Sequence, residues 1–198
     1  MKKNSLIFLL VFLLCFFILL IRVNYFIDLD RTVYLILISF QSYGITNLVK
    51  YYTFFGSATF LIAITVISWL LFKNKYYSKI ITINLILSFL TNQVLKFIIA
   101  RDRPYFIHLV KENGFSFPSG HAMVSFCFYG LIIYLLHKSN LKYKNIIIIL
   151  LILLIFVIGA TRIYLGVHYF SDIIGAYLAG LIYLLVFTNY IKTNKEKG

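Results

Sequence analysis

The feature that most constrains this chain is a series of long apolar stretches, each close in length to a membrane-spanning helix. Hydrophobic side chains make up 62% of the 198 residues, and charged side chains only 13%. A helix needs about 20 apolar residues to cross the hydrocarbon core of a bilayer, and water-soluble domains do not repeat such stretches. The sequence therefore predicts an all-α, polytopic membrane protein, with residues 1–198 forming one membrane-embedded domain.

Six stretches are predicted to span the membrane as helices of one bundle. They are Leu6–Ile21, Phe54–Phe72, Ile80–Ala100, Ser119–His137, Asn145–Thr161 and Ser171–Ile191. The first is interpreted as a spanning helix and not as a cleaved signal peptide, because no small-residue cleavage site follows it. Asn24–Tyr52, between the first two spans, mixes charged with apolar residues and is predicted to be an amphipathic segment at the interface.

Basic residues predict how the bundle is oriented. The formal net charge is +13. Eleven lysines and one acidic residue fall in the N-terminal segment, the loops after the second and fourth spans, and the C-terminal tail (Lys2, Lys3, Lys73, Lys75, Lys79, Lys138, Lys142, Lys144, Lys192, Lys195, Lys197 and Glu196). Because positive charge accumulates on the cytoplasmic side, we expect both termini in the cytoplasm of a cell (inner) membrane. Because membrane topology accounts for the excess of positive charge, the charge does not indicate that the protein binds nucleic acid.

Three polar clusters fall on the outer face in this topology. Lys96 and Arg103 lie at the outer end of the third span, Pro118 to His121 at the start of the fourth, and Arg162 to Asp172 between the fifth and sixth. Charged groups at membrane depth are costly, rare and usually functional. Their convergence on one face therefore predicts an extracytoplasmic active site built from residues 96–172.

The last cluster has the most informative spacing. His168 and Asp172 are four residues apart, so they share a face if Asp172 lies in the first turn of a helix. A carboxylate there can accept one imidazole N–H, which leaves the other ring nitrogen as a nucleophile. Gly166 is expected to let the backbone turn sharply between Arg162 and His168.

The cations of the clusters indicate an anionic ligand. Lys96, Arg103 and Arg162 carry positive charge to one region, and arginine matches phosphate in shape. Ser119 and Gly120 open a helix, whose unpaired N–H groups also favour phosphate. Two histidines and one aspartate suffice for phosphoryl transfer, which depends on positioning and charge stabilisation. No carboxylate or cysteine set suggests a metal site, so we expect no metal and no other cofactor.

The motifs Lys-x6-Arg-Pro, Pro-Ser-Gly-His and Arg-x5-His-x3-Asp occur in this order between Lys96 and Asp172. The pattern resembles the type 2 phosphatidic acid phosphatase superfamily, membrane lipid phosphatases related to vanadium haloperoxidases. The resemblance implies that His168 attacks phosphorus to form a phosphohistidine, that Asp172 orients it, and that His121 protonates the leaving group. It also implies which residues hold the phosphate oxygens: Lys96, Arg103, Ser119, Gly120 and Arg162.

The resemblance implies a lipid phosphate or diphosphate as substrate, with its tail entering from surrounding membrane lipid. Undecaprenyl diphosphate, phosphatidylglycerophosphate and phosphatidic acid are the candidates, and the sequence does not choose among them. Two other functions stay open. A phosphotransferase would pass the same phosphohistidine to an acceptor hydroxyl, and a non-catalytic lipid-binding or channel-like protein would keep only the fold. No obligate protein partner is evident.

Several polar and small residues outside the motifs are given structural interpretations. Arg101 is interpreted as an interfacial anchor and His108 as a non-catalytic loop histidine. Asn84 and Asn92 are expected to hydrogen-bond between helices. Three aromatic residues are expected in an interfacial belt, namely Tyr164, Tyr169 and Phe170. Four small residues of the sixth span are expected to form a packing face, namely Gly175, Ala176, Ala179 and Gly180.

Overall fold

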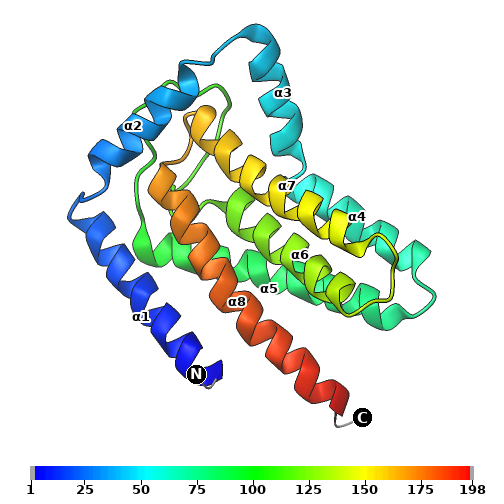
Figure 1. Cartoon of the computed structure of the whole chain (residues 1–198). Coiled ribbons are helices and arrows are strands. Elements are labelled where there is room, and N and C mark those ends of the chain that lie inside the picture. Colours follow the sequence, from blue (N-terminus) through cyan, green and yellow to red (C-terminus); the bar gives the residue numbers. More distant parts are fainter. Residues whose placement is uncertain (1–2, 197–198) are drawn as a thin grey trace.

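The structure is a computed structural model that describes residues 3–196, and all the regular secondary structure within this range is α-helical. The helices are α1 (Lys3–Arg22), α2 (Ile27–Ile38), α3 (Tyr43–Phe54), α4 (Ala58–Leu71), α5 (Lys75–Ile99), α6 (Gly120–His137), α7 (Lys144–Tyr164) and α8 (Phe170–Glu196) (Figure 1). The predicted all-α architecture is confirmed.

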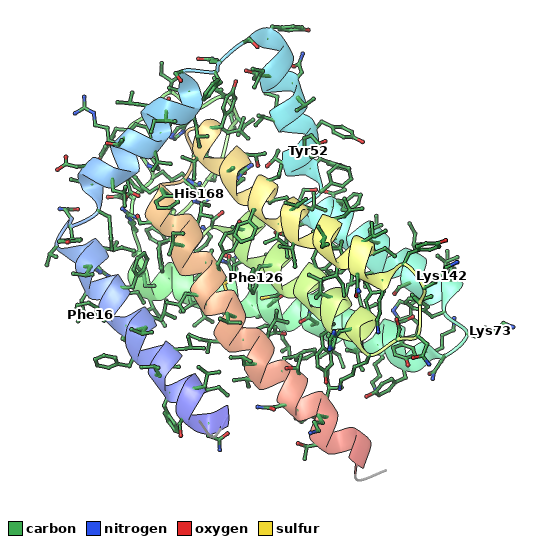
Figure 2. All side chains as sticks on the ribbon, viewed as in Figure 1. Phe16, Tyr52, Lys73, Phe126, Lys142 and His168 are labelled. Atoms are coloured by element: carbon green, nitrogen blue, oxygen red, sulfur yellow. The ribbon has the colours of Figure 1, made fainter. Side chains whose placement is uncertain are left out.

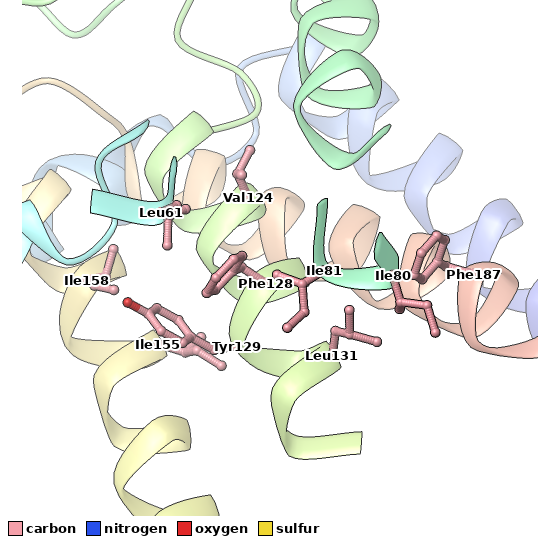
Figure 3. Close-up of a cluster of buried hydrophobic side chains, with 10 residues drawn as sticks. All are labelled: Leu61, Ile80, Ile81, Val124, Phe128, Tyr129, Leu131, Ile155, Ile158 and Phe187. Carbon is pink, nitrogen blue, oxygen red and sulfur yellow. The ribbon is translucent and has the colours of Figure 1, made fainter. Parts of the chain in front are cut away.

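α6 lies in the middle of the bundle, where it packs against α5, α7 and α8 (Figure 1). Side chains from α4, α5, α6, α7 and α8 form the largest buried cluster, which Figure 3 shows. Leu61, Leu131 and Ile158 in this cluster are completely buried. Large apolar side chains on the outside of the bundle, such as Phe8 and Leu70, are more than 70% exposed. An apolar surface of this extent is typical of a protein in contact with lipid.

Five helices within the described range are long and apolar enough to cross a membrane, namely α1, α5, α6, α7 and α8. The stretch predicted as the second span, Phe54–Phe72, is shorter as a helix. α4 has 14 residues, because residues 55–57 form a turn and Ser57 caps the helix by accepting a hydrogen bond from the Phe60 N–H. At 1.5 Å per residue, α4 is about 21 Å long, less than the ~30 Å of a bilayer core.

The segment predicted to lie at the interface forms two helices. α2 and α3 meet at an angle of 118°, and Ser42 caps α3 by accepting from the Ile45 N–H. α2 packs against α7 and α8, and α3 packs against α7 (Figure 1). Only Asp30 and Tyr34 of α2 are buried. These two residues are four apart, so they hold one face of α2 against the bundle, together with the partly buried Val33, Leu37 and Ile38.

The small residues of α8 allow close helix packing, as predicted. A Cβ atom at Gly175 would lie 2.2 Å from the ring of Phe117, and one at Gly180 would lie 2.8 Å from the ring of Phe126. Ala176 is completely buried. α8 is thereby brought close to α6 and to the loop that precedes it. Asn84 of α5 donates to the Cys127 carbonyl of α6, and Asn92 of α5 donates to Met123 Sδ of α6 and to the Pro118 carbonyl just before that helix, which confirms their role between helices.

The turn between α7 and α8 depends on Gly166. Its φ angle is +75°, in the left-handed region, and a Cβ atom there would lie 2.3 Å from the carbonyl oxygen of Ile107. The Leu109 N–H donates to the Leu165 carbonyl at 3.0 Å, so the α5–α6 loop is fixed against this turn. Gly166 therefore brings residues of the second and third motifs to the same end of the bundle.

Replacement of Gly166 by alanine is expected to destabilise the protein by about 3 kcal/mol, because a positive φ and a clash with a backbone carbonyl add together. The free energy of unfolding in detergent micelles measures this effect. Gly44→Ala is the matched control, since nothing lies within 4 Å of the position of its Cβ. Equal stabilities of the two variants would contradict the expectation.

Candidate active site

The three predicted clusters meet at one end of the bundle, at the end of α5, the start of α6 and the turn between α7 and α8. A cavity of about 600 Å³ opens there. Five of the eight predicted site residues line it, namely Lys96, Arg103, Gly120, His121 and His168. The other three, Ser119, Arg162 and Asp172, are buried beside it. The structure thus brings together all the residues that the motifs contribute.

His168 and Asp172 form a buried pair. The distance from His168 Nδ1 to Asp172 Oδ2 is 3.4 Å, and the two residues are 2% and 0% exposed. Asp172 Oδ2 also accepts from the Tyr169 N–H at 2.9 Å, which fixes the carboxylate at the start of α8. His168 Nε2 lies on the cavity side, 3.4 Å from Arg103 Nη1. If Nδ1 carries the proton, the Nε2 lone pair faces the cavity, where it accepts a long hydrogen bond from Arg103 Nη1 that a substrate can replace.

The charge state of His168 follows from its burial in the turn between α7 and α8. Loss of hydration lowers the pKa of His168 to about 4, although the carboxylate of Asp172 opposes this shift. The ring is therefore neutral at pH 7, which is the form that can act as a nucleophile.

The start of α6 presents its first turn to the cavity. The Ser119 hydroxyl caps the helix by accepting from the Ala122 N–H at 3.5 Å. Asn92 of α5 holds the preceding residue by donating to the Pro118 carbonyl at 3.2 Å. Gly120 and His121 line the cavity. The first N–H groups of a helix have no partners within the helix, so this end of α6 favours an anion.

The three cations of the site are held by backbone carbonyls, by Thr53 of α3 and by the loop residue Glu112. Lys96 Nζ donates to the Phe115 carbonyl. Arg103 donates to three carbonyls, at 2.9 to 3.0 Å, those of Asn113, Gly114 and Val167. Arg162 is only 2% exposed; its Nη1 donates to Thr53 Oγ1 at 2.9 Å, and its Nη2 pairs with Glu112. The cations are therefore oriented before any ligand binds.

Arg101 is not an interfacial anchor, contrary to the prediction. Its guanidinium lies between two buried carboxylates, 2.6 Å from Asp172 Oδ1 and 3.0 Å from Asp30 Oδ2, and 4.0 Å from the centre of the Tyr169 ring. The Asp30 side chain is completely buried and also accepts from the Ser171 N–H at 2.7 Å. Arg101 and Asp30 thus join α2 to the His168–Asp172 pair.

The motifs do not include Asp30, although the sequence holds one signal for it. Asp30 and Tyr34 are four residues apart in an otherwise amphipathic helix, which is the spacing of one helical face. The prediction that Tyr164 lies in an interfacial aromatic belt is also wrong. Tyr164 is buried, and its hydroxyl oxygen lies 2.8 Å from that of Thr46. The Tyr169 ring packs against the Arg101 guanidinium, so Tyr169 has a role in the site beyond that of an interfacial aromatic residue. Among the residues described, no group of three or more His, Cys, Asp or Glu side chains is arranged to hold a metal ion.

Comparison with known proteins agrees with the geometry of the site. The family model of the PAP2 superfamily matches residues 78–196, which is more than half of the chain. The chain belongs to this superfamily. It is a membrane lipid phosphatase of a metal-independent family.

Similar proteins support this assignment over most of the chain. Phosphatidylglycerophosphatase B of Bacillus subtilis is 36% identical over 166 residues, covering 78% of this chain and 77% of the relative. The crystal structure of a transmembrane PAP2 type phosphatidylglycerolphosphate phosphatase from Bacillus subtilis is 27% identical, with a TM-score of 0.86 over 98% of each chain. The Aquifex aeolicus LpxE structure shares the fold, with 24% identity and a TM-score of 0.65 over 83% of this chain and 94% of that one.

Replacement of Asp30 by asparagine is expected to destabilise the protein by about 3 kcal/mol, because it leaves the Arg101 guanidinium with one carboxylate fewer in a buried position. Asp28→Asn is the matched control, since Asp28 lies on the same helix with an exposed side chain. Unfolding in micelles measures both variants. A D30N protein as stable as D28N would show that the contact contributes little.

The His168 ring is expected to stay neutral as the pH falls well below the usual histidine pKa of about 6.5. Because burial lowers the pKa of His168 to about 4 in the folded protein, the unfolded state takes up a proton first. The stability that this group contributes is present above pH ~6.5 and is lost as the pH falls toward 4. NMR of ¹³C-histidine-labelled protein, with His168→Gln to assign the signal, gives the midpoint. A midpoint near 6.5 would contradict the expected burial effect.

Proposed function

We propose that this lipid phosphatase hydrolyses its substrate through a phosphohistidine formed on His168. The observation that carries the proposal is the His168–Asp172 pair, in which His168 Nδ1 contacts the carboxylate and Nε2 lies 3.4 Å from Arg103 Nη1 at the wall of a cationic cavity. His168 Nε2 attacks phosphorus, and the bond from phosphorus to the leaving oxygen breaks. His121 donates a proton to that oxygen. His121 then takes a proton from water, which attacks the phosphohistidine and releases inorganic phosphate.

The phosphate oxygens are proposed to bind to the cations and to the start of α6. Lys96, Arg103 and Arg162 supply the positive charge, and Ser119 and Gly120 supply N–H groups at the positive end of the helix dipole. Backbone carbonyls already orient Lys96 and Arg103. Donors fixed in this way need little reorganisation when charge develops on the phosphoryl group, so they stabilise the transition state effectively.

The lipid tail is proposed to enter from the bilayer between α4 and α5. The same cavity that holds the catalytic histidines extends along apolar side chains of these two helices, namely Leu61, Ile62, Leu85, Ile86, Phe89 and Leu90. Several of these side chains are about half exposed on the outside of the bundle, among them Ile62, Ile86 and Leu90. An apolar path that joins the outer surface to a polar site suits a substrate with an acyl or prenyl tail.

Phosphatidylglycerophosphate is the proposed substrate, since the name of the similar Bacillus subtilis sequence and the description of the similar Bacillus subtilis crystal structure both refer to it. Undecaprenyl diphosphate and phosphatidic acid are the competing lipids. The residues around the phosphate recognise the group that all three share, so the tail path and the headgroup side of the cavity must distinguish them.

We further propose that the site faces outward from a cell membrane and that both termini are cytoplasmic. In Figure 2, Lys73 and Lys142 lie at the end of the bundle away from His168. Lysine-rich loops are typical of the cytoplasmic side. The chain is proposed to work as one domain, because α1 and α2, which precede the region matched by the family, pack on α8 and supply Asp30.

Replacement of His168 by alanine is expected to lower turnover by ~10⁴-fold or more, as for other nucleophiles that act within a catalytic unit. Phosphate release by purified protein in detergent measures this, on phosphatidylglycerophosphate, undecaprenyl diphosphate and phosphatidic acid with EDTA present. His108→Ala is the matched control. It removes a histidine of the α5–α6 loop that bonds to the Pro104 carbonyl and does not line the cavity.

Three outcomes would contradict parts of the proposal. Activity of the H168A protein within tenfold of the wild type would move the nucleophile elsewhere. Loss of activity in EDTA, with recovery on adding Mg²⁺, would contradict metal-free chemistry. Phosphate that reaches an acceptor lipid and not water would make the enzyme a phosphotransferase.

A further inference from the structure

Glu112 is a carboxylate inside the proposed phosphate site that no motif includes. It lies in the loop between α5 and α6 and lines the cavity. Its Oε1 accepts from Arg162 Nη2, and its Oε2 lies 3.9 Å from Arg103 Nη2. It therefore bridges the two arginines to which we assign phosphate oxygens.

A carboxylate and a phosphate make the same kind of contact with a guanidinium group, through two oxygens on a planar fork of N–H donors. Both are anions, so they repel when they approach the same arginine in a partly buried site. Glu112 and a substrate phosphate therefore compete for Arg103 and Arg162.

The two partners of this ion pair differ in their freedom to move. Arg162 is 2% exposed and is fixed by its bond to Thr53, whereas the Glu112 side chain is 28% exposed. Arg162 Nε is buried and has no hydrogen-bond partner among the described residues. The Glu112 carboxylate can therefore move toward solvent, whereas the Arg162 guanidinium stays in place. Arg162 also keeps one N–H donor, at Nε, that a ligand could use.

We propose that Glu112 determines how tightly this active site binds phosphate. In the empty enzyme its carboxylate occupies the place of phosphate oxygens on Arg162 and Arg103. A lipid phosphate displaces it, and its return after hydrolysis helps to release inorganic phosphate. The inference rests on the proposed function, in which these two arginines hold the phosphate group.

Glu112 would in this way select for lipid phosphates. Displacing the carboxylate disfavours binding of every phosphate ligand alike. A ligand with a tail recovers that free energy in the apolar part of the cavity, beside residues such as Leu61 and Phe89. Inorganic phosphate has no tail and binds weakly, so the product does not hold the enzyme.

The test is equilibrium binding of inorganic phosphate to the purified full-length protein, followed by calorimetry, for the wild type and for Glu112→Gln and Glu112→Ala. Glutamine keeps the shape of the side chain and removes its charge. Both variants are expected to bind phosphate ~10-fold or more tightly than the wild type, since the competing anion is gone. The product should also inhibit both variants at correspondingly lower concentrations.

Asp102→Asn is the matched control. Asp102 belongs to the same loop, has an exposed side chain and carries the same charge, so its removal tests for a general electrostatic effect. Phosphate affinity of the D102N protein is expected within about twofold of the wild type, because exposed charges are well screened.

Phosphate affinity of the E112Q protein equal to or weaker than that of the wild type would overturn the inference and make Glu112 a group that only orients Arg162. An equal gain in D102N would overturn it too. The binding measurement needs no turnover. A wild-type protein that hydrolyses no lipid would therefore refute the proposed function, while the comparison of variants would still decide the role of Glu112.

Discussion

The buried carboxylate of Asp172 is the group on which the active-site end of the bundle depends. It contacts His168, accepts from the Tyr169 N–H and pairs with Arg101. A buried charge without partners is strongly unfavourable, and the Arg101 guanidinium offsets it. Arg101 in turn pairs with Asp30, so α2 closes the network and takes part in the electrostatics of the site. The orientation of the His168 ring is thus a property of the whole end of the bundle, not of one helix turn.

The parts of this arrangement that the sequence predicts are local ones. The apolar stretches predict the long helices, the four-residue spacing of His168 and Asp172 predicts their contact, and Gly166 predicts the turn. Arg101 and Asp30 lie 71 residues apart, and no periodicity connects them. Pairing of this kind depends on how α2 docks against the bundle, which sequence spacing alone does not determine.

The same limit explains the interfacial segment and the short helix that follows it. A mixed pattern of charged and apolar residues predicts an amphipathic segment, but it does not say where the segment bends. The 118° bend falls before α3, whose cap is Ser42, and α4 begins only after its own cap, Ser57. A single serine caps each of these helix starts. Serine also occurs at many other positions of the chain, so its presence alone does not predict where a helix begins.

Asp172 and Glu112 are two carboxylates beside the proposed phosphate site, and their different environments suit the different roles proposed for them. Asp172 is completely buried and held by a backbone N–H, a histidine and an arginine, so it cannot leave. Glu112 is on a loop and partly exposed, and within the described range its carboxylate is held by the two arginines that also suit a phosphate. A fixed carboxylate can keep a nucleophile in one tautomer through the whole reaction, whereas a displaceable one can alternate with the ligand. Asp172 and Glu112 carry the same chemical group. Their surroundings therefore suit Asp172 to orient His168 throughout the reaction and suit Glu112 to exchange with the ligand.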